Sequence, residues 1–344
     1  MRVEERILSD FINIIRSIIR NGEYGIIEPD EFQKYDSALG ELDYYKDDKL
    51  RVALIGEFKS GKSSLLNALF DGNYSATDLL EMTSWIARYF AAEKEYCNIL
   101  MVNGATKSIP LQEFLNKTQK RLFSDSELRA IRRVDIGIKT KLLDTIFIDC
   151  PGSGTINLEN EDLMTQALNE ADLLLVCIDV TIIGGEREAA LFKLLNDTRT
   201  PYVCVMTKSD YIESESDREE VLDYITGKLK VDKTKIIFTS AKHGSTDKGV
   251  LKLRSVLSNE YGPIKNVIRE NSKQAFFNRI FMGMHQLIAG LLKQLHNTQD
   301  AIEGYERKLL AVGETVSKDV IAESKTMFQN EFTGKLLRLE IRIS

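Results

Sequence analysis

The sequence is poor in the residues that build metal centres and redox sites. It has three histidines and four cysteines among its 344 residues. No two histidines have the spacing of metal ligands, and the cysteines form no CxxC pair. Three of the cysteines lie in or beside apolar runs, where a cysteine usually behaves as a small buried hydrophobic residue. We therefore expect the cysteines to pack in the core rather than carry redox or metal chemistry.

Excess positive charge and long apolar runs are also missing. The chain has 46 Lys and Arg against 52 Asp and Glu, a formal net charge of −6. The chain therefore lacks the net positive charge that is typical of nucleic-acid-binding proteins, and we expect no nucleic-acid partner. No stretch reaches the roughly 20 apolar residues of a membrane span, and the N-terminus carries acids among its apolar residues and lacks a cleavage site. We therefore expect a cytoplasmic protein.

Short aliphatic runs alternate with helical stretches in the middle of the chain, between residues 48 and 262. Runs of apolar residues without polar alternation suit strands that are buried on both faces. Strands that alternate with helices are typical of an α/β domain with a mostly parallel sheet and helices on both faces. The predicted strands cover residues 51–55, 98–102, 145–148, 173–178, 202–206 and 235–239.

Helical patterns dominate on both sides of this domain. We expect N-terminal helices in residues 1–47 and C-terminal helices in residues 263–344, because apolar residues recur there at helical spacing. The two flanking segments would bundle together, and Gly262-Pro263 is a candidate hinge. The predicted helices cover residues 5–20, 29–45, 267–295, 300–310 and 316–339.

A phosphate-binding loop is predicted where the first strand ends. The segment GEFKSGKS fits the pattern GxxxxGK[ST], follows an aliphatic strand and precedes a helical run. The glycines let the backbone wrap a phosphate and direct its N–H groups inward at a helix N-terminus. Lys62 would bridge the terminal phosphates, and the Ser63 hydroxyl would bind Mg²⁺. The nucleotide-binding residues expected here are Gly56, Glu57, Phe58, Lys59, Ser60, Gly61, Lys62, Ser63 and Ser64.

A second part of the site is predicted at Asp149-Cys-Pro-Gly152, at the end of the strand over 145–148. An acid that leaves such a strand can hold the Mg²⁺ shell, and the N–H of Gly152 can meet a γ-phosphate. Alone, this four-residue segment is weak evidence for a nucleotide site. Because it follows the phosphate loop in the order that such sites have, it becomes strong evidence.

Two further segments predict the base. Thr207-Lys208-Ser-Asp210 follows a strand, and its carboxylate could accept both the N1–H and the exocyclic amine of guanine. Adenine presents no such pair of donors, so Asp210 favours GTP over ATP. Lys208 would lay its stem along the base. Ser240-Ala241-Lys242 follows the last strand, and a backbone N–H there could reach the guanine carbonyl oxygen.

Together these residues resemble the signature of the translation-factor-type GTPases, and more narrowly that of the dynamin-like proteins, particularly the bacterial ones. The similarity rests on GEFKSGKSSLLNALF, the long interval to DCPGSG, and TKSD with Thr in place of the commoner Asn. It covers residues 50–262 and includes VDIGIKTKLLDTIFIDCPG, where the family leads a strand and a hairpin into DxPG. The resemblance implies a P-loop GTPase domain that binds GTP or GDP with Mg²⁺, held by Ser63, Asp149 and a threonine.

That threonine would be Thr83, which would complete the Mg²⁺ coordination and position the attacking water; Thr77 is the alternative. Ser153 stands where Ras-like enzymes have a glutamine that orients water. Phe58 and Lys59 stand where eukaryotic dynamins supply polar groups and a monovalent cation. Lys59 could provide a fixed positive charge in cis, or it could point to solvent or to a partner chain. The catalytic candidates are Lys62, Thr83, Lys59 and Gly152.

The resemblance implies a GTPase that couples nucleotide-dependent dimerisation and neck movement to membrane remodelling. Its partners would be GTP, a second GTPase domain of the same or a related dynamin-like protein, and a lipid reached through a region outside this chain. It would then act at the inner face of the membrane. The chain ends at Ser344 without a helix stop signal, which favours a piece of a longer protein over a short relative. The alternative function is a nucleotide-gated switch with slow or no hydrolysis.

Overall fold

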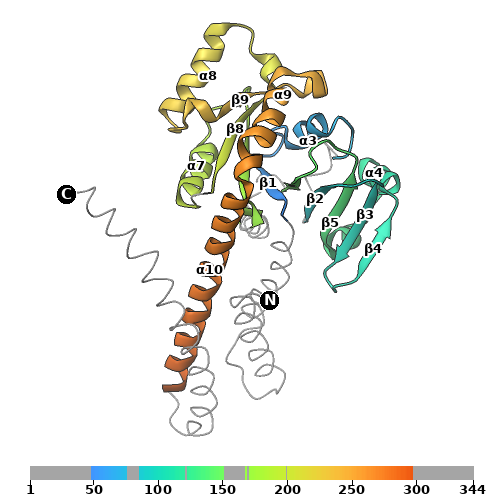
Figure 1. Cartoon of the computed structure of the whole chain (residues 1–344), viewed down its shortest axis with the longest axis vertical. Coiled ribbons are helices and arrows are strands. Elements are labelled where there is room, and N and C mark those ends of the chain that lie inside the picture. Colours follow the sequence, from blue (N-terminus) through green and yellow to red (C-terminus); the bar gives the residue numbers. More distant parts are fainter. Residues whose placement is uncertain are drawn as a thin grey trace, which may run out of the picture. The chain divides into compact units, whose positions relative to one another are not determined.

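The computed structural model describes residues 48–75, 85–120, 122–150, 167–168, 170–198 and 200–296, and strands from these residues form one sheet (Figure 1). The strand order is β4-β3-β5-β2-β6-β1-β7-β8-β9. The strands are β1 Leu50–Ile55, β2 Ile86–Ala91, β3 Tyr96–Met101, β4 Thr106–Ile109, β5 Ile131–Ile138, β6 Thr145–Asp149, β7 Leu173–Asp179, β8 Tyr202–Thr207 and β9 Ile236–Phe238.

The half of the sheet from β6 to β9 is parallel throughout, because β1 pairs in parallel with β6 and β7, and β8 with β7 and β9. In the other half β2 and β5 are parallel, while β2–β6, β3–β5 and β3–β4 are antiparallel. The prediction of a mostly parallel sheet is confirmed, and each of the six predicted strands is present. In a parallel sheet the carboxyl ends of the strands meet at one edge, which is where ligands bind in open α/β folds.

The prediction of a hairpin just before the Asp149 segment is wrong. Strand β5 does not pair with β6, because β2 lies between them and pairs with both. Strand β4 was not predicted, since its sequence Thr-Lys-Ser-Ile is polar and it lies exposed at the edge of the sheet, where side chains need not be apolar.

Helices cover both faces of the sheet, as predicted. Alternate residues of β1 point to opposite sides: Val52 and Leu54 join the core beneath α3 and α9, whereas Ala53 and Ile55 join the core beneath α7 and α8. All four cysteines are buried, which confirms their expected packing role. The helices are α3 Lys62–Phe70, α4 Leu111–Gln119, α5 Asp125–Ala130, α7 Glu186–Thr198, α8 Glu215–Gly227, α9 Lys248–Ser255 and α10 Gly262–His296.

The predicted long helix after the sheet is present as α10, which begins at Gly262, the first residue of the candidate hinge. Helix α9 leads through a π-helical segment, Val256–Tyr261, directly into α10 (Figure 1). The N–H of Gly262 donates to the oxygen of Leu257, five residues back. This wider turn lets the chain reach Pro263, which has no N–H of its own, without a break in the helix. Residues 48–272 form one compact unit, so the first turns of α10 belong with the sheet.

One hydrogen bond to the backbone and one ion pair hold these first turns of α10 within the unit. The guanidinium of Arg269 donates to the backbone oxygen of Lys49, and the ammonium of Lys265 lies 3.3 Å from the Asp144 carboxylate. Val267, the first apolar residue of the helix predicted over 267–295, is 63% exposed, and the adjacent Ile268 is buried. None of the helices within the described residues is both long enough and apolar enough to cross a membrane.

Several predicted features lie outside the described residues. These are Thr83, Thr77, Gly152, Ser153, and the helices expected over residues 5–20, 29–45, 300–310 and 316–339.

Candidate nucleotide site

The loop between β1 and α3 has the backbone that the phosphate-loop pattern predicts. Gly56 lies so close to β7 that a Cβ atom there would be 2.3 Å from the backbone oxygen of Cys177. Gly61 takes a left-handed conformation, φ +85°, and caps the N-terminus of α3 without a side chain. Gly56 therefore has to be glycine because β7 lies so close, and Gly61 because of its left-handed backbone. No side chain caps the N-terminus of α3, so its N–H groups are suited to bind an anion.

Lys62 lies folded beneath this loop. Its ammonium group donates to the backbone oxygens of Gly56 and Glu57, at 2.9 and 2.8 Å, and its side chain is buried. Burial lowers the pKa of Lys62, and the charge of Asp149 opposes that shift. A cation held by two carbonyl oxygens inside a phosphate loop is placed to contact a phosphate that enters the loop.

Asp149 lies at the end of β6 beside the start of α3. Its Oδ2 accepts from the Ser75 hydroxyl at 3.1 Å and from the Ser63 hydroxyl at 3.4 Å, while its Oδ1 is buried without a partner. Burial raises the pKa of Asp149 to about 6, against the opposing effects of Lys62, Ser75 and Ser63.

This cluster fits a Mg²⁺ ion. Mg²⁺ takes oxygen ligands and is usually bound through one or two carboxylates together with substrate phosphates. The buried, unpartnered Oδ1 of Asp149 and the adjacent Ser63 hydroxyl are ligands of that kind. Thr83, the third predicted ligand, lies outside the described residues.

The Thr207 segment is joined directly to the phosphate loop. The Thr207 hydroxyl contacts the backbone oxygens of Ser60 and Ile178, at 2.7 and 3.0 Å. A Cβ atom on Gly61 would lie 3.2 Å from the Cβ of Thr207. The third predicted motif therefore packs against the first, as expected for one site.

The two segments predicted to recognise the base are also joined to one another. The Ser240 hydroxyl donates to Oδ1 of Asp210 at 2.7 Å, and the N–H of Ser209 donates to the oxygen of Thr239 at 3.0 Å. Asp210 is exposed, so its other oxygen remains available to a ligand. Lys208 takes a left-handed backbone conformation, φ 56°, and its ammonium pairs with Asp179.

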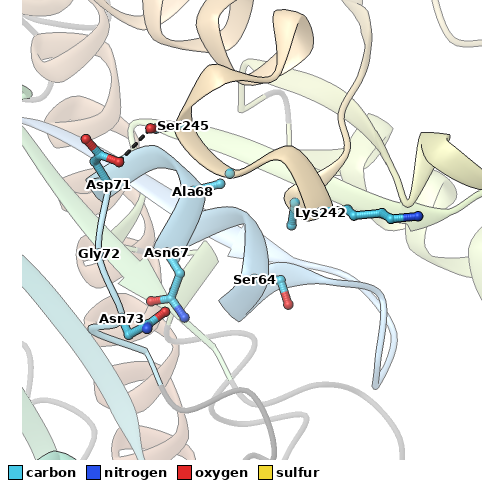
Figure 2. Close-up of a pocket in the computed structure, with 10 residues that line it drawn as sticks. Ser64, Asn67, Ala68, Asp71, Gly72, Asn73, Lys242 and Ser245 are labelled. Carbon is cyan, nitrogen blue, oxygen red and sulfur yellow. Dashed lines mark hydrogen bonds between the residues drawn. The ribbon is translucent and has the colours of Figure 1, made fainter.

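A pocket of about 570 Å³ opens between α3 and the segment η4 Ala241–Thr246 (Figure 2). Ser64, Ala241 and Lys242 were predicted to bind nucleotide, and all three line it. In Figure 2 Asp71 and Ser245 point toward one another across one end of the pocket and form a hydrogen bond. Its other lining residues, Asn67, Ala68, Asp71, Gly72, Asn73, Gly244 and Ser245, were not predicted.

Part of the pocket lining could have been predicted from the sequence of α3. Ser64, Asn67, Ala68 and Asp71 recur at helical spacing and so share one face of α3 and its C-terminal end. Three of these residues are polar, which marks that face as one that meets solvent or a ligand. Ser75 and Asp179 were also missed, and each contacts a predicted site residue from a distant part of the sequence.

Lys59 is placed differently from the other loop residues. Its side chain is exposed, and its ammonium lies 5.1 Å from the centre of the Phe58 ring. Lys62 and Ser63, by contrast, are buried in the loop.

Comparison with known proteins agrees with this geometry. A model of the dynamin family matches residues 52–209, the part of the chain that holds the phosphate loop, Asp149 and Lys208. Over these residues the chain is similar to the dynamin-like GTPases. Among curated relatives of this dynamin-like chain are two proteins from Campylobacter jejuni. Dynamin-like protein 1 is 23% identical, and the match covers 74% of this chain and 41% of that protein. Dynamin-like protein 2 is 24% identical, and the match covers 83% of this chain and 46% of that protein.

A solved structure of an oligomerised bacterial dynamin pair shares the fold. The two structures superpose over 100% of this dynamin-like chain and 65% of the solved chain. The TM-score is 0.50 and the sequence identity is 18%. The chain spans less than half the length of the two Campylobacter relatives.

Proposed function

We propose that this dynamin-like chain binds GTP with Mg²⁺ and hydrolyses it to GDP and phosphate. The observation that carries the proposal is the cluster of Lys62, Ser63 and Asp149, which places a buried cation and two oxygen ligands at the mouth of a phosphate loop. The contact between Asp210 and Ser240 supports guanine as the base, because it holds a carboxylate at the carboxyl edge of the sheet.

The reaction would be in-line attack of water on the γ-phosphoryl group. Lys62 would leave the loop carbonyls for the phosphate oxygens and stabilise the charge that develops on them. Ser63, Asp149 and Thr83 would hold Mg²⁺, which neutralises charge on the β- and γ-phosphates when bound. Gly152 would donate its N–H to the γ-phosphate.

We further propose that turnover drives dimerisation through the GTPase domains and movement of the flanking helices, and that this movement acts on a membrane through a region outside the chain. Two relatives are named dynamin-like proteins, and a bacterial dynamin pair forms oligomers, which supports self-association or a related partner. The domain division would be residues 1–47, 48–262 and 263–344, with the first turns of α10, up to residue 272, packed as part of the sheet unit. The chain would work in the cytoplasm, peripheral to a membrane.

A nucleotide-gated switch with slow hydrolysis is the second candidate. Its support is the contrast between the two loop lysines: Lys62 is buried in the loop, whereas the Lys59 side chain is exposed and its ammonium lies 5.1 Å from the centre of the Phe58 ring.

Turnover of GTP and ATP at several protein concentrations separates these functions. Specific GTPase activity that rises with concentration supports hydrolysis with dimerisation. Tight GTP binding with negligible turnover supports the switch, and preference for ATP contradicts the guanine assignment.

The site itself is tested by Lys62→Ala, which should abolish nucleotide binding or turnover. Lys233→Ala is the matched control, since Lys233 is exposed and precedes the amino end of β9, opposite the predicted site. Unchanged nucleotide binding and turnover in Lys62→Ala would contradict the assignment of the phosphate loop as the nucleotide site.

A further inference from the structure

A buried carboxylate that no predicted motif contains holds the lysine of the third motif. Asp179 is the last residue of β7, and its Oδ2 pairs with the ammonium of Lys208. The Asp179 side chain is 3% exposed and that of Lys208 is 37% exposed. The acid is therefore a fixed part of the sheet edge, and the lysine stem reaches out from it toward solvent.

The orientation of this carboxylate is fixed by its own turn. Oδ1 of Asp179 accepts from the N–H of Thr181 at 2.9 Å and from its hydroxyl at 2.7 Å. Both carboxylate oxygens are therefore engaged. Although burial favours the neutral acid, the bonds from Lys208 and Thr181 outweigh it and lower the pKa of Asp179.

The strand register explains why these two residues meet. Asp179 and Thr207 are partners in the β7–β8 ladder, so Lys208 leaves β8 directly beside the Asp179 carboxylate. Lys208 also adopts a left-handed backbone conformation there. A non-glycine residue in that conformation needs compensation from its surroundings, and the ion pair supplies a contact of that kind.

Two carboxylates thus take different positions around the predicted base site. Asp210, held by Ser240, is exposed and can meet the edge of a base. Asp179 is buried and engaged, so it cannot meet a base itself.

We propose that Asp179 is a positioning residue for guanine recognition: it anchors the Lys208 ammonium so that the lysine stem forms a preset platform along one face of the base. The inference rests on the proposed function, because it assumes that guanine binds beside Lys208 and Asp210. A platform that is fixed before binding costs less ordering of the side chain when the nucleotide enters. Asp179 should therefore affect affinity for the base and leave the phosphate loop unchanged.

The test measures dissociation constants of the full chain for GTP, GDP and inorganic tripolyphosphate, which has phosphates but no base. Asp179→Asn should weaken GTP and GDP binding about tenfold, the effect of one lost hydrogen bond to a charged group. Tripolyphosphate binding should not change. Loss of tripolyphosphate affinity by the same factor would overturn the proposal, because the effect would then be a general distortion of the site.

A double substitution shows whether Asp179 acts through Lys208. Lys208→Met removes the ammonium and keeps most of the apolar stem. Asp179→Asn should weaken GTP binding in the wild-type background and add nothing in the Lys208→Met background. Additive losses would contradict the positioning role.

Thr181→Val keeps the proposal testable if Asp179→Asn does not fold. It removes only the hydroxyl bond to Oδ1 and keeps the shape of the side chain. We expect a smaller loss of GTP affinity in the same direction, and unchanged affinity would overturn the role of Asp179. Wild-type protein that binds no guanine nucleotide would instead refute the proposed function, so the two failures are distinguishable.

Discussion

The hydroxyl of Ser75 donates to Oδ2 of Asp149 across 3.1 Å, and the other oxygen of that carboxylate is left buried without a partner. Ser75 is itself held by Asn67 of α3. The Asn67 amide donates to the Ser75 backbone oxygen at 2.9 Å and accepts from the Ser75 N–H at 2.8 Å. The helix that begins at the phosphate loop therefore fixes the serine that orients the predicted Mg²⁺ ligand.

The first prediction concerns this orientation. Ser75→Ala should lower the affinity for GTP in Mg²⁺ about fivefold, from the roughly 1 kcal/mol of one side-chain hydrogen bond. Because Ser75 acts through the carboxylate that would hold Mg²⁺, the loss should disappear when the metal is removed with a chelator. Titration of a fluorescent GTP analogue with and without Mg²⁺ measures both affinities.

Ser108→Ala is the control for this substitution. Ser108 is an exposed serine of the edge strand β4 that also donates to a side chain, the amide oxygen of Asn98. It should leave both affinities unchanged. An equal loss for Ser75→Ala with and without Mg²⁺ would show that Ser75 serves the fold rather than the carboxylate.

The sequence predicted the parts of the site whose chemistry is local. The phosphate loop could be found because its glycines and Lys62 act through the backbone of one short segment, and the strand–loop–helix context follows from adjacent residues. The contacts of Ser75 and Asp179 could not be found in this way. Ser75 meets Asp149 across 74 residues, and Asp179 meets Lys208 across 29, through pairings that only the folded sheet creates.

The same distinction holds for the fold. Buried strands such as β1 and β7 have apolar runs that identify them, whereas the polar edge strand β4 has no such pattern. The expected hairpin before Asp149 failed because adjacency in sequence does not exclude an inserted strand, and β2 occupies that position. At the candidate hinge, Gly262-Pro263, the helical path is continuous, because the preceding π-helical turn accommodates a proline that has no N–H to donate.

The second prediction concerns pH and the buried Asp172 at the amino end of β7. Burial raises the pKa of this carboxyl above 3.8, although the Arg51 N–H, 2.9 Å away, and the charge of Arg269 oppose the shift. The folded state therefore holds the proton more tightly than the unfolded chain. Its contribution to stability is fully present below the unfolded pKa and is lost as pH rises toward the folded value.

Asp172→Asn should remove this loss, so its free energy of unfolding relative to wild type should increase as the pH rises above about 4. Urea unfolding at a series of pH values measures it. Asp223→Asn, on the exposed surface of α8, controls for the removal of one charge. A relative stability of Asp172→Asn that falls with pH would show that the attraction of Arg269 outweighs burial.

The third prediction concerns the close approach of the phosphate loop to β7. Gly56→Ala should destabilise the protein by about 3 kcal/mol and abolish GTP binding, because its Cβ would meet the Cys177 oxygen at 2.3 Å. Gly227→Ala is the matched control at the end of α8. Apart from its chain neighbours and the nearby backbone of α8, no atom lies within 4 Å of its added methyl group, so the substitution should be neutral or stabilise by up to about 1 kcal/mol. Wild-type GTP affinity in Gly56→Ala would contradict the loop geometry.

The last prediction concerns Arg254 of α9, which caps the C-terminus of α3. Its guanidinium donates to the backbone oxygens of Ala68 and Leu69, at 2.9 and 2.8 Å, and reaches the oxygen of Ser245 at 3.5 Å. Arg254→Met keeps the apolar stem but leaves those helix-end carbonyls without this donor and without a positive charge. We expect a loss of about 1–2 kcal/mol in the free energy of unfolding.

Because Arg254 also contacts the loop that carries Ser245, GTP affinity should fall in Arg254→Met while tripolyphosphate affinity is maintained. Urea unfolding and nucleotide titration measure the two effects. Lys252→Met removes an exposed positive charge from the same helix and should change neither quantity. Equal effects of the two substitutions would mean that the net charge of α9 matters and the helix cap does not. A loss of stability with unchanged GTP affinity would show that the cap supports α3 alone and does not hold the base-recognition segment in place.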